Sequence, residues 1–162
     1  SSTAIMYNIN NIYNNYIEEY NETVDKNTFK KICEEFNIEI IDAILDGKTF
    51  DMGNNLSTLS IRRVDRDPRT PRVDWGESIK YRKELEASGI DLYNASTGKG
   101  EKWYIYYTDK FYCKYYWKKG KCRIPNKSVY RFTPTRGLKG NKEKLINILK
   151  TDDLAYLKFK KQ

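Results

Sequence analysis

Apolar side chains at helical spacing in the first 45 residues constrain the fold of this chain most strongly. Between residues 9 and 20, isoleucines and tyrosines recur three and four positions apart, which predicts an amphipathic helix. Asp25 is a suitable N-cap for a second helix, and Gly47 stands where a glycine commonly ends one. The apolar face of this second helix comprises Phe29, Ile32, Cys33, Phe36, Ile40 and Ile44.

Strands are expected further along the chain. Runs rich in β-branched and aromatic residues occupy residues 48–52, 56–61, 102–107, 111–118 and 128–134. Gly53-Asn54-Asn55 predicts a turn between the first two runs, and Thr108-Asp109-Lys110 predicts a hairpin between the third and fourth. Each of these runs is short, as strands in globular domains usually are.

Further helices complete an expected α+β fold. Residues 78–89 predict a short helix that ends in a glycine, residues 141–150 predict a C-terminal helix, and residues 153–160 a tail element. The expected architecture is a pair of N-terminal helices with a β-ribbon arm, followed by a small aromatic-rich β-sheet with a C-terminal helix.

The charge is distributed unevenly along the 162 residues. The net charge is +8, but residues 1–98 carry 12 basic and 17 acidic side chains, a balance of −5. Residues 99–162 carry 18 basic and 5 acidic side chains, a balance of +13. The change falls at residues 95–101, whose serine, threonine and glycines are typical of a linker. We therefore expect an N-terminal domain over residues 1–98 and a basic, aromatic-rich region over residues 99–162.

Residues 62–75 (RRVDRDPRTPRVDW) form the candidate functional segment. Five arginines and two prolines lie within its first eleven residues, and no apolar alternation runs through them. Prolines hold such a segment extended. The segment follows a predicted strand, so it is expected to be an extended arm, a linker or a plain surface loop.

The order of these elements is similar to that of a known protein family. A capped helix ending in DAILDG, a strand, a turn, a second strand and an arm bearing Arg66-Asp67-Pro68 resemble the HU/IHF family of small DNA-bending proteins. The resemblance covers residues 26–70; the family's usual Gly-Phe-Gly turn is replaced by Gly53-Asn54-Asn55-Leu56. It implies a dimer whose arms enter the minor groove of DNA. The nucleic-acid contacts expected for this function are Arg62, Arg63, Arg66, Pro68 and Arg69 in the arm, together with Lys114, Lys118, Lys119 and Lys121 of the basic C-terminal region.

The acidic residues favour a different use of the arm. Asp65, Asp67 and Asp74 interrupt the arginines, and Asp67 directly precedes Pro68. A carboxylate is repelled from the minor groove, where the negative potential is highest. Alternating arginine and aspartate instead suits ion pairs between subunits, with apolar anchors beside them. The expected interface residues are Arg62, Arg63, Arg66, Pro68, Arg69, Arg72, Val73 and Trp75.

A second resemblance bears on the setting. An HU/IHF-like half with an added C-terminal part is similar to proteins of crAss-like bacteriophages, some of which form rings in the neck and tail below the portal. It implies a homo-oligomeric ring in the virion, made in the host cytoplasm, with the portal and other neck or tail proteins as partners. Genomic DNA in the channel is a further implied contact. DNA binding and bending in the manner of HU/IHF proteins remains the alternative function.

The aromatic run over residues 103–117 leaves two interpretations open. Tryptophans and tyrosines interleaved with lysines are typical of surfaces on which single-stranded nucleic-acid bases stack. The same residues are enriched at protein interfaces, because they combine a large contact area with a polar group. The dense alternation and the lack of an RNP-like motif favour the interface.

Catalysis, cofactors and metals are not expected. The sequence has no histidine, no phosphate-binding loop and no nucleophile motif, so we expect a non-enzymatic protein without a cofactor. Cys113 and Cys122 lack two further ligands for a zinc site. An odd total of three cysteines favours free thiols, and no apolar run is long enough for a membrane span.

Overall fold

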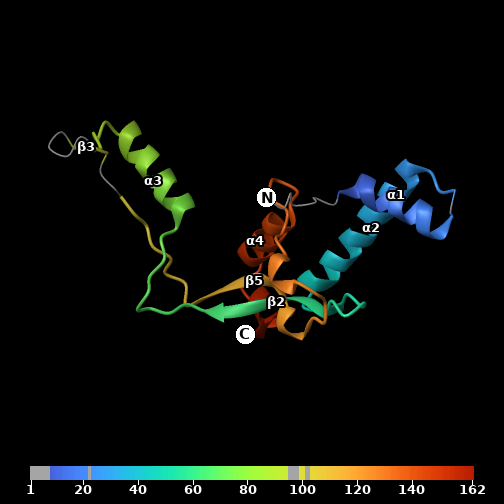
Figure 1. The fold of residues 1–162 in the computed structure, drawn as a ribbon. Coiled ribbons are helices and arrows are strands. Elements are labelled where there is room, and N and C mark those ends of the chain that lie inside the picture. Colours follow the sequence, from blue (N-terminus) through green and yellow to red (C-terminus); the bar gives the residue numbers. More distant parts are fainter. Residues whose placement is uncertain (1–7, 22, 95–98, 101–102) are drawn as a thin grey trace. The chain divides into compact units, whose positions relative to one another are not determined.

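The computed structural model describes residues 8–21, 23–94, 99–100 and 103–162, and it is an α+β protein as expected (Figure 1). The chain divides into two compact units, which are described separately. The body unit comprises Ser1–Ile61 and Tyr115–Lys160, and the inserted unit comprises Arg62–Lys114 with Lys161–Gln162. These units follow spatial contacts, whereas the expected boundary between residues 98 and 99 followed charge. That boundary and most of the expected linker, residues 95–98 and 101, lie outside the described residues.

Two helices begin the body unit, as their apolar spacing predicts. Helix α1 (Ile9–Tyr20) is capped by Asn8, and helix α2 (Lys26–Leu45) is capped by Asp25, whose carboxylate accepts the backbone N–H of Thr28. The helices lie side by side (Figure 1) because two tyrosines of α1 pack on Phe29 of α2. The ring centroids of Tyr13 and Phe29 are 5.4 Å apart.

Helix α2 ends at Gly47 as predicted. The N–H of Gly47 donates to Ile44 and the N–H of Lys48 donates to Ala43, a pair of bonds that satisfies carbonyls the helix leaves open. Gly47 adopts a φ of +92°, which residues with a Cβ rarely adopt. A Cβ at this position would also lie 2.6 Å from the carbonyl oxygen of Lys158. The glycine therefore permits both the turn and the close approach of the C-terminal segment.

A four-stranded sheet follows α2. Strand β2 (Thr58–Asp65) is central: β1 (Phe50–Asp51) and β6 (Lys160–Lys161) pair with it, and so does β5 (Phe111–Trp117). Strands β1 and β2 are antiparallel, with Phe50 opposite Leu59. The turn between them runs through Gly53, Asn54 and Asn55, all at positive φ, as the sequence predicts.

The aromatic-rich run does not form a sheet of its own. The sequence predicts that residues 102–107 and 111–118 form a hairpin, but β5 pairs with β2 instead. The predicted strand over residues 128–134 is also wrong, since Lys127–Val129 is a 3₁₀ turn (η2). Backbone bonds there are local: the N–H of Val129 donates to Asn126 and that of Tyr130 to Lys127. These short-range turns use the donors that a strand would need for pairing.

The core of the body unit lies between α2, β2 and the C-terminal helix α4 (Asn141–Thr151), which was predicted over residues 141–150. Side chains buried there come from α2, β2, α4, the tail and the loop after β5; they are Ile41, Ile44, Leu45, Leu59, Ile61, Cys122, Leu145, Ala155 and Phe159. Strand β5 is tied to this unit by side-chain bonds. The Tyr115 hydroxyl donates to the carbonyl of Asn141, and the Trp117 indole donates to that of Leu56.

Short elements complete the body unit. A 3₁₀ turn at Lys119–Lys121 (η1) follows β5, and another at Ala155–Lys158 (η3) falls within the predicted tail element. Strand β6 then ends the chain.

The described residues of the inserted unit form one helix and little core. Helix α3 (Trp75–Ala87) begins three residues before the predicted start because Asp74 caps it, accepting the N–H of Glu77. Strands β3 (Tyr93–Asn94) and β4 (Lys99–Gly100) form an antiparallel pair. Among the described residues of this unit, Leu92 is the only buried apolar side chain.

Candidate subunit interface and the Arg66 hollow

The segment Arg62–Trp75 is not extended throughout its length. Its first four residues complete β2, a loop follows, and Val73 forms an isolated antiparallel bridge with Tyr106. Asp74 and Trp75 then belong to the cap and first turn of α3. The predicted arm is therefore a strand end and a loop that leads into a helix.

The loop is held by pairing with residues 105–110. The N–H of Arg66 donates to the carbonyl of Lys110 at 2.8 Å, and that of Tyr107 to Arg72 at 3.0 Å. The N–H of Asp74 donates to Ile105 at 2.8 Å. The two chain segments thus run antiparallel, and residues 67–71 bulge away between the paired positions. Residues far apart in the sequence are brought together by this ladder.

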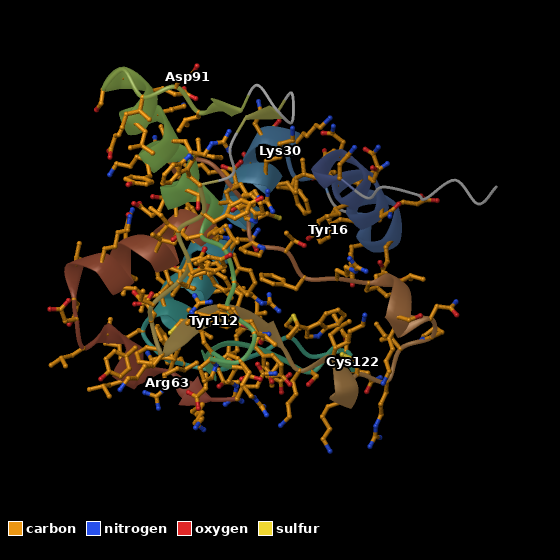
Figure 2. The ribbon with its side chains drawn as sticks, turned by 90° about the vertical axis from the view of Figure 1, so that its left-hand side faces the viewer. Tyr16, Lys30, Arg63, Asp91, Tyr112 and Cys122 are labelled. Atoms are coloured by element: carbon orange, nitrogen blue, oxygen red, sulfur yellow. The ribbon has the colours of Figure 1, made fainter. Side chains whose placement is uncertain are left out.

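Arg66 lies between two tyrosine rings. Its guanidinium carbon is 4.1 Å from the ring centroid of Tyr107 and 4.7 Å from that of Tyr112. Tyr112 is labelled on β5 in Figure 2. Cations are attracted to the faces of aromatic rings, and two faces hold the guanidinium plane in one orientation. The Nε of Arg66 is buried and has no hydrogen-bond acceptor among the described residues.

A hollow of about 650 Å³ opens beside Arg66. Its walls combine basic, acidic and apolar side chains from the loop, from residues 107–110 that face it, and from β5. The lining residues are Asp65, Arg66, Asp67, Pro68, Thr70, Pro71, Arg72, Tyr107, Thr108, Asp109, Lys110 and Tyr112. Three of the predicted interface residues, Arg66, Pro68 and Arg72, therefore meet at one site.

Two of the carboxylates in this lining are already paired within the chain. Asp67 accepts both the Nε–H and an Nη–H of Arg69, at 3.0 and 3.1 Å. This pairing, together with the Arg69 backbone N–H, lowers the pKa of Asp67 below its usual value. Asp65 forms an ion pair with Lys161 at 2.5 Å. These two aspartates are thus engaged inside the subunit, rather than left for the inter-subunit pairs that their spacing predicts.

The remaining predicted arginines have different surroundings. Arg63, labelled in Figure 2, lies over the Phe111 ring with its guanidinium carbon 5.5 Å from the ring centroid. Arg62 is half-buried and interacts with other residues of the chain. Arg69 is exposed apart from its bond to Asp67. The arginines of the segment therefore have different neighbours within the chain.

The predicted lysine contacts also differ from one another. Lys119 donates to the carbonyls of Ser128 and Tyr130 and lies over the Trp117 ring, so this lysine holds the loop after β5. Lys118 and Lys121 are exposed beside it, whereas Lys114 is half-buried on β5. Two of the four lysines are thus placed to meet a partner.

Trp75 packs edge-on against Tyr104, with ring centroids 5.5 Å apart, and keeps 59 % of its surface exposed. It stands in the first turn of α3, close in sequence to the bridge at Val73. The indole is fixed by one aromatic neighbour and otherwise free to contact a partner. Its role as an interface anchor stays a prediction.

The described residues hold no cluster of three or more cysteine or acidic side chains that would bind a metal. The three cysteines are free thiols. Burial raises the pKa of Cys113, and the nearby Arg63 partly opposes this effect. In the described part of the chain, no helix has the length and apolar character to cross a membrane. Comparison with protein-family models, curated proteins and solved structures finds no match to this chain.

Sequence reasoning named Arg66 but not its two aromatic neighbours. Tyr107 and Tyr112 were included only as members of a dense aromatic run, and they stand more than forty residues from Arg66. The aromatic run itself could have suggested these neighbours, because guanidinium groups are attracted to the faces of aromatic rings.

Proposed function

We propose that this chain is a non-enzymatic structural subunit that assembles with copies of itself into a ring in the neck or tail of a bacteriophage virion, below the portal. The observation that carries the proposal is the thin core of the inserted unit. Leu92 is its one buried apolar side chain among the described residues. Eight large apolar or aromatic side chains of the same unit are at least 37 % exposed, namely Trp75, Ile79, Tyr81, Ile90, Trp103, Tyr104, Tyr106 and Tyr107.

Such exposure supports an interface. Monomeric proteins scatter single apolar side chains over the surface, but a concentration of exposed aromatic residues marks an interaction surface. Tryptophan and tyrosine are the residues most enriched in the buried centre of protein interfaces. Trp75 and Ile79, one helical turn apart on α3, and Tyr104 and Tyr106, on the segment that faces the loop, offer such a surface.

The body unit adds a second exposed apolar surface. Ile32 and Phe36 of α2 are each 57 % exposed, although both belong to the face that the sequence predicts to be apolar. Helix α1 covers this face at Phe29. A subunit with separate apolar surfaces on two units suits a head-to-tail contact, which closes into a ring when the rotation between neighbours fits.

The virion setting rests on the resemblance described above. The helices, the capping residues and the turn over residues 26–55 have the order that the resemblance implies. The ring, the portal and the neighbouring neck or tail proteins are the partners that it implies for this chain.

The proposal is tested by size-exclusion chromatography with light scattering, followed by electron microscopy of the largest species. We expect an oligomer whose mass is an integer multiple of 19.2 kDa and that appears as a ring. Ile79→Ser should weaken this oligomer, whereas Lys80→Ser, an exposed neighbour on the same helix, should not. A chain that stays monomeric at all accessible concentrations contradicts the proposal.

DNA binding is a second candidate, favoured by the exposed lysines Lys118 and Lys121 beside η1. We expect this binding to be weak and independent of sequence, because Lys119 is engaged inside the chain and Arg69 is paired with Asp67. Fluorescence anisotropy with a short duplex at physiological salt measures it. Nanomolar affinity, lost in Pro68→Ala, would instead favour an HU/IHF-like bending protein.

A further inference from the structure

We propose that the hollow beside Arg66 is a carboxylate-binding site, and that a glutamate on α2 of a second copy fills it in the assembled ring. The inference rests on the proposed function for the presence of that second copy. It adds the identity of the contact, which that proposal leaves open.

The Arg66 guanidinium is held in position by aromatic rings of its own chain. Its plane is clamped between the rings of Tyr107 and Tyr112, so its orientation is fixed before any partner arrives. Its Nε–H is buried without an acceptor among the described residues. Arg66 also lines the hollow, and a carboxylate is the acceptor whose geometry matches the planar guanidinium.

The side chains that line the hollow include more unpaired cations than unpaired carboxylates. Among the described residues, the cations Arg66, Arg72 and Lys110 line the hollow without an ion pair. Of the lining carboxylates, Asp65 and Asp67 are paired with Lys161 and Arg69, and Asp109 alone is not. The hollow therefore has an excess of unpaired positive charge, which attracts an anionic group.

The lining of the hollow favours a single carboxylate over a nucleic acid. A nucleic-acid backbone would bring several closely spaced negative charges to a lining that holds the unpaired Asp109. One carboxylate can reach Arg66 without a second charge meeting that residue. The apolar parts of the walls, at Pro68, Pro71 and the two tyrosine rings, further favour a group carried beside apolar side chains.

Helix α2 supplies such a group. Glu35 and Glu39 are exposed and lie one helical turn apart, along one side of a row formed by Ile32 and Phe36, which are also exposed. A carboxylate on the edge of an apolar row matches a hollow in which a fixed cation stands among prolines and tyrosines. We assign Glu39 as the nearer candidate because it lies beside both apolar residues on the helical wheel.

The test is sedimentation velocity of the full chain over a range of concentrations. Arg66→Gln removes the charge and should weaken self-association about 30-fold or more, the usual result of truncating one partner of a buried charge pair. Arg66→Lys keeps the charge but loses the planar fork, so it should also weaken association. Lys83→Gln, an exposed position on α3 outside the hollow, is the matched control and should leave association unchanged.

A charge exchange identifies the partner. Glu39→Arg and Arg66→Glu should each weaken association, and the combined variant should recover part of the loss. Far-UV circular dichroism and thermal unfolding of each variant verify that the fold is retained. Unchanged association of Glu39→Arg and Glu35→Arg overturns the assignment of α2.

The two proposals fail differently. If the wild-type chain self-associates and Arg66→Gln does so equally well, the carboxylate site is wrong while the ring proposal stands. If the wild-type chain does not self-associate, both are wrong. If a DNA duplex binds the wild-type chain and not Arg66→Gln, the hollow takes phosphate and the carboxylate site is overturned.

Discussion

The hydroxyl of Ser78 meets both backbone hydrogen-bonding groups of Ile105. Its Oγ accepts the N–H of Ile105 at 2.7 Å and donates to the Ile105 carbonyl at 3.2 Å. Ser78 is only 1 % exposed, and it joins α3 to the segment that faces the Arg62–Trp75 loop. In a unit with one buried apolar side chain among its described residues, this polar contact has an unusually large structural role.

Ser78→Ala should therefore loosen the inserted unit. The Ile105 N–H would lose its acceptor while remaining inside the fold, which costs about 1–3 kcal/mol. We expect faster hydrogen exchange at the Ile105 amide and across α3, with little change at α2. Ser88→Ala is the control, because that hydroxyl is exposed and donates only to Glu84 of its own helix. Equal exchange in both variants would mean that Ser78 does not hold α3.

Gly47→Ala should destabilise the body unit. Alanine at a φ of +92° is strained by about 1 kcal/mol or more, and its Cβ would lie 2.6 Å from the Lys158 carbonyl oxygen. Since that oxygen belongs to the backbone, relief requires the C-terminal segment to shift. We expect a loss of about 3 kcal/mol in the free energy of unfolding, measured by denaturant titration.

Gly137→Ala separates the two causes. Gly137 has a similar φ of +97°, but nothing lies within 4 Å of the position of its Cβ. This substitution should lower the free energy of unfolding by about 1 kcal/mol, from backbone strain alone. If both substitutions cost the same, the approach of Lys158 to α2 contributes nothing.

The elements that the sequence predicts correctly depend on local signals. Helix α2 has an N-cap at Asp25, an apolar repeat and a terminal glycine, and all three lie within about twenty residues. The pairing of β5 with β2 has no such signal, because more than forty residues separate the strands. The turn-like residues at 108–110 favour a hairpin between residues 102–107 and β5, but β5 pairs with the distant strand β2 instead.

The candidate site, like the fold, was predictable only where the residues that define it lie close together in the sequence. The arginines and prolines of residues 62–75 stand out by composition, so the candidate segment was found. The conformation of the segment could not be predicted, because it depends on long-range contacts. Asp74 caps α3, and Arg66 is held by Tyr107 and by Tyr112 of β5. The charge split is likewise a property of sequence order alone. The body unit carries 17 basic and 13 acidic side chains and the inserted unit 13 and 9, so each has a net charge of +4.

The stability of the body unit should depend on Tyr115 at alkaline pH. Burial, and secondarily the charge of Asp42, raise the pKa of Tyr115 from 10.0 to about 12. The unfolded chain therefore loses this proton first. Its contribution to stability is complete below pH 10 and is lost as the pH rises toward 12. A two-unit shift corresponds to at most about 2.7 kcal/mol, and solvent screening of this half-buried group reduces it to about 1 kcal/mol.

Tyr115→Phe tests this dependence. At neutral pH the variant should be less stable by about 1 kcal/mol, because the hydrogen bond to the Asn141 carbonyl is lost. Between pH 10 and 12 the difference from the wild type should shrink, as the variant has no such proton to lose. Unfolding curves at pH 8, 10 and 11.5 measure the trend. A constant difference would show that Tyr115 titrates as it does in the unfolded chain.

Self-association should weaken as the salt concentration rises. The proposed contact joins a glutamate of α2 on one copy to Arg66 of another, so opposite charges attract the two copies electrostatically. Salt screens such attraction over a Debye length of about 10 Å at 0.1 M. Stopped-flow light scattering at several salt concentrations should give a falling association rate. A contact found wholly between acidic surfaces would contradict this head-to-tail arrangement.

Trp75→Ala should reduce assembly while leaving the helices formed. The indole is 59 % exposed and contacts Tyr104 through its edge, so most of its area is available to a neighbouring subunit. Tryptophan dominates many interface centres, and its truncation there costs on the order of 2 kcal/mol or more. The prolines at 68 and 71 limit the freedom of the preceding loop, which reduces the entropy lost on docking.

Far-UV circular dichroism recorded beside sedimentation velocity distinguishes the outcomes for Trp75→Ala. Helices α1 and α2 are held by contacts such as those of Phe29 with Tyr13 and Tyr16, which do not involve Trp75. Their signal should persist when assembly weakens. Loss of helix together with assembly would place Trp75 in the core of its own subunit. Unchanged assembly would mean that Trp75, the one aromatic residue of the segment, contacts no neighbouring subunit.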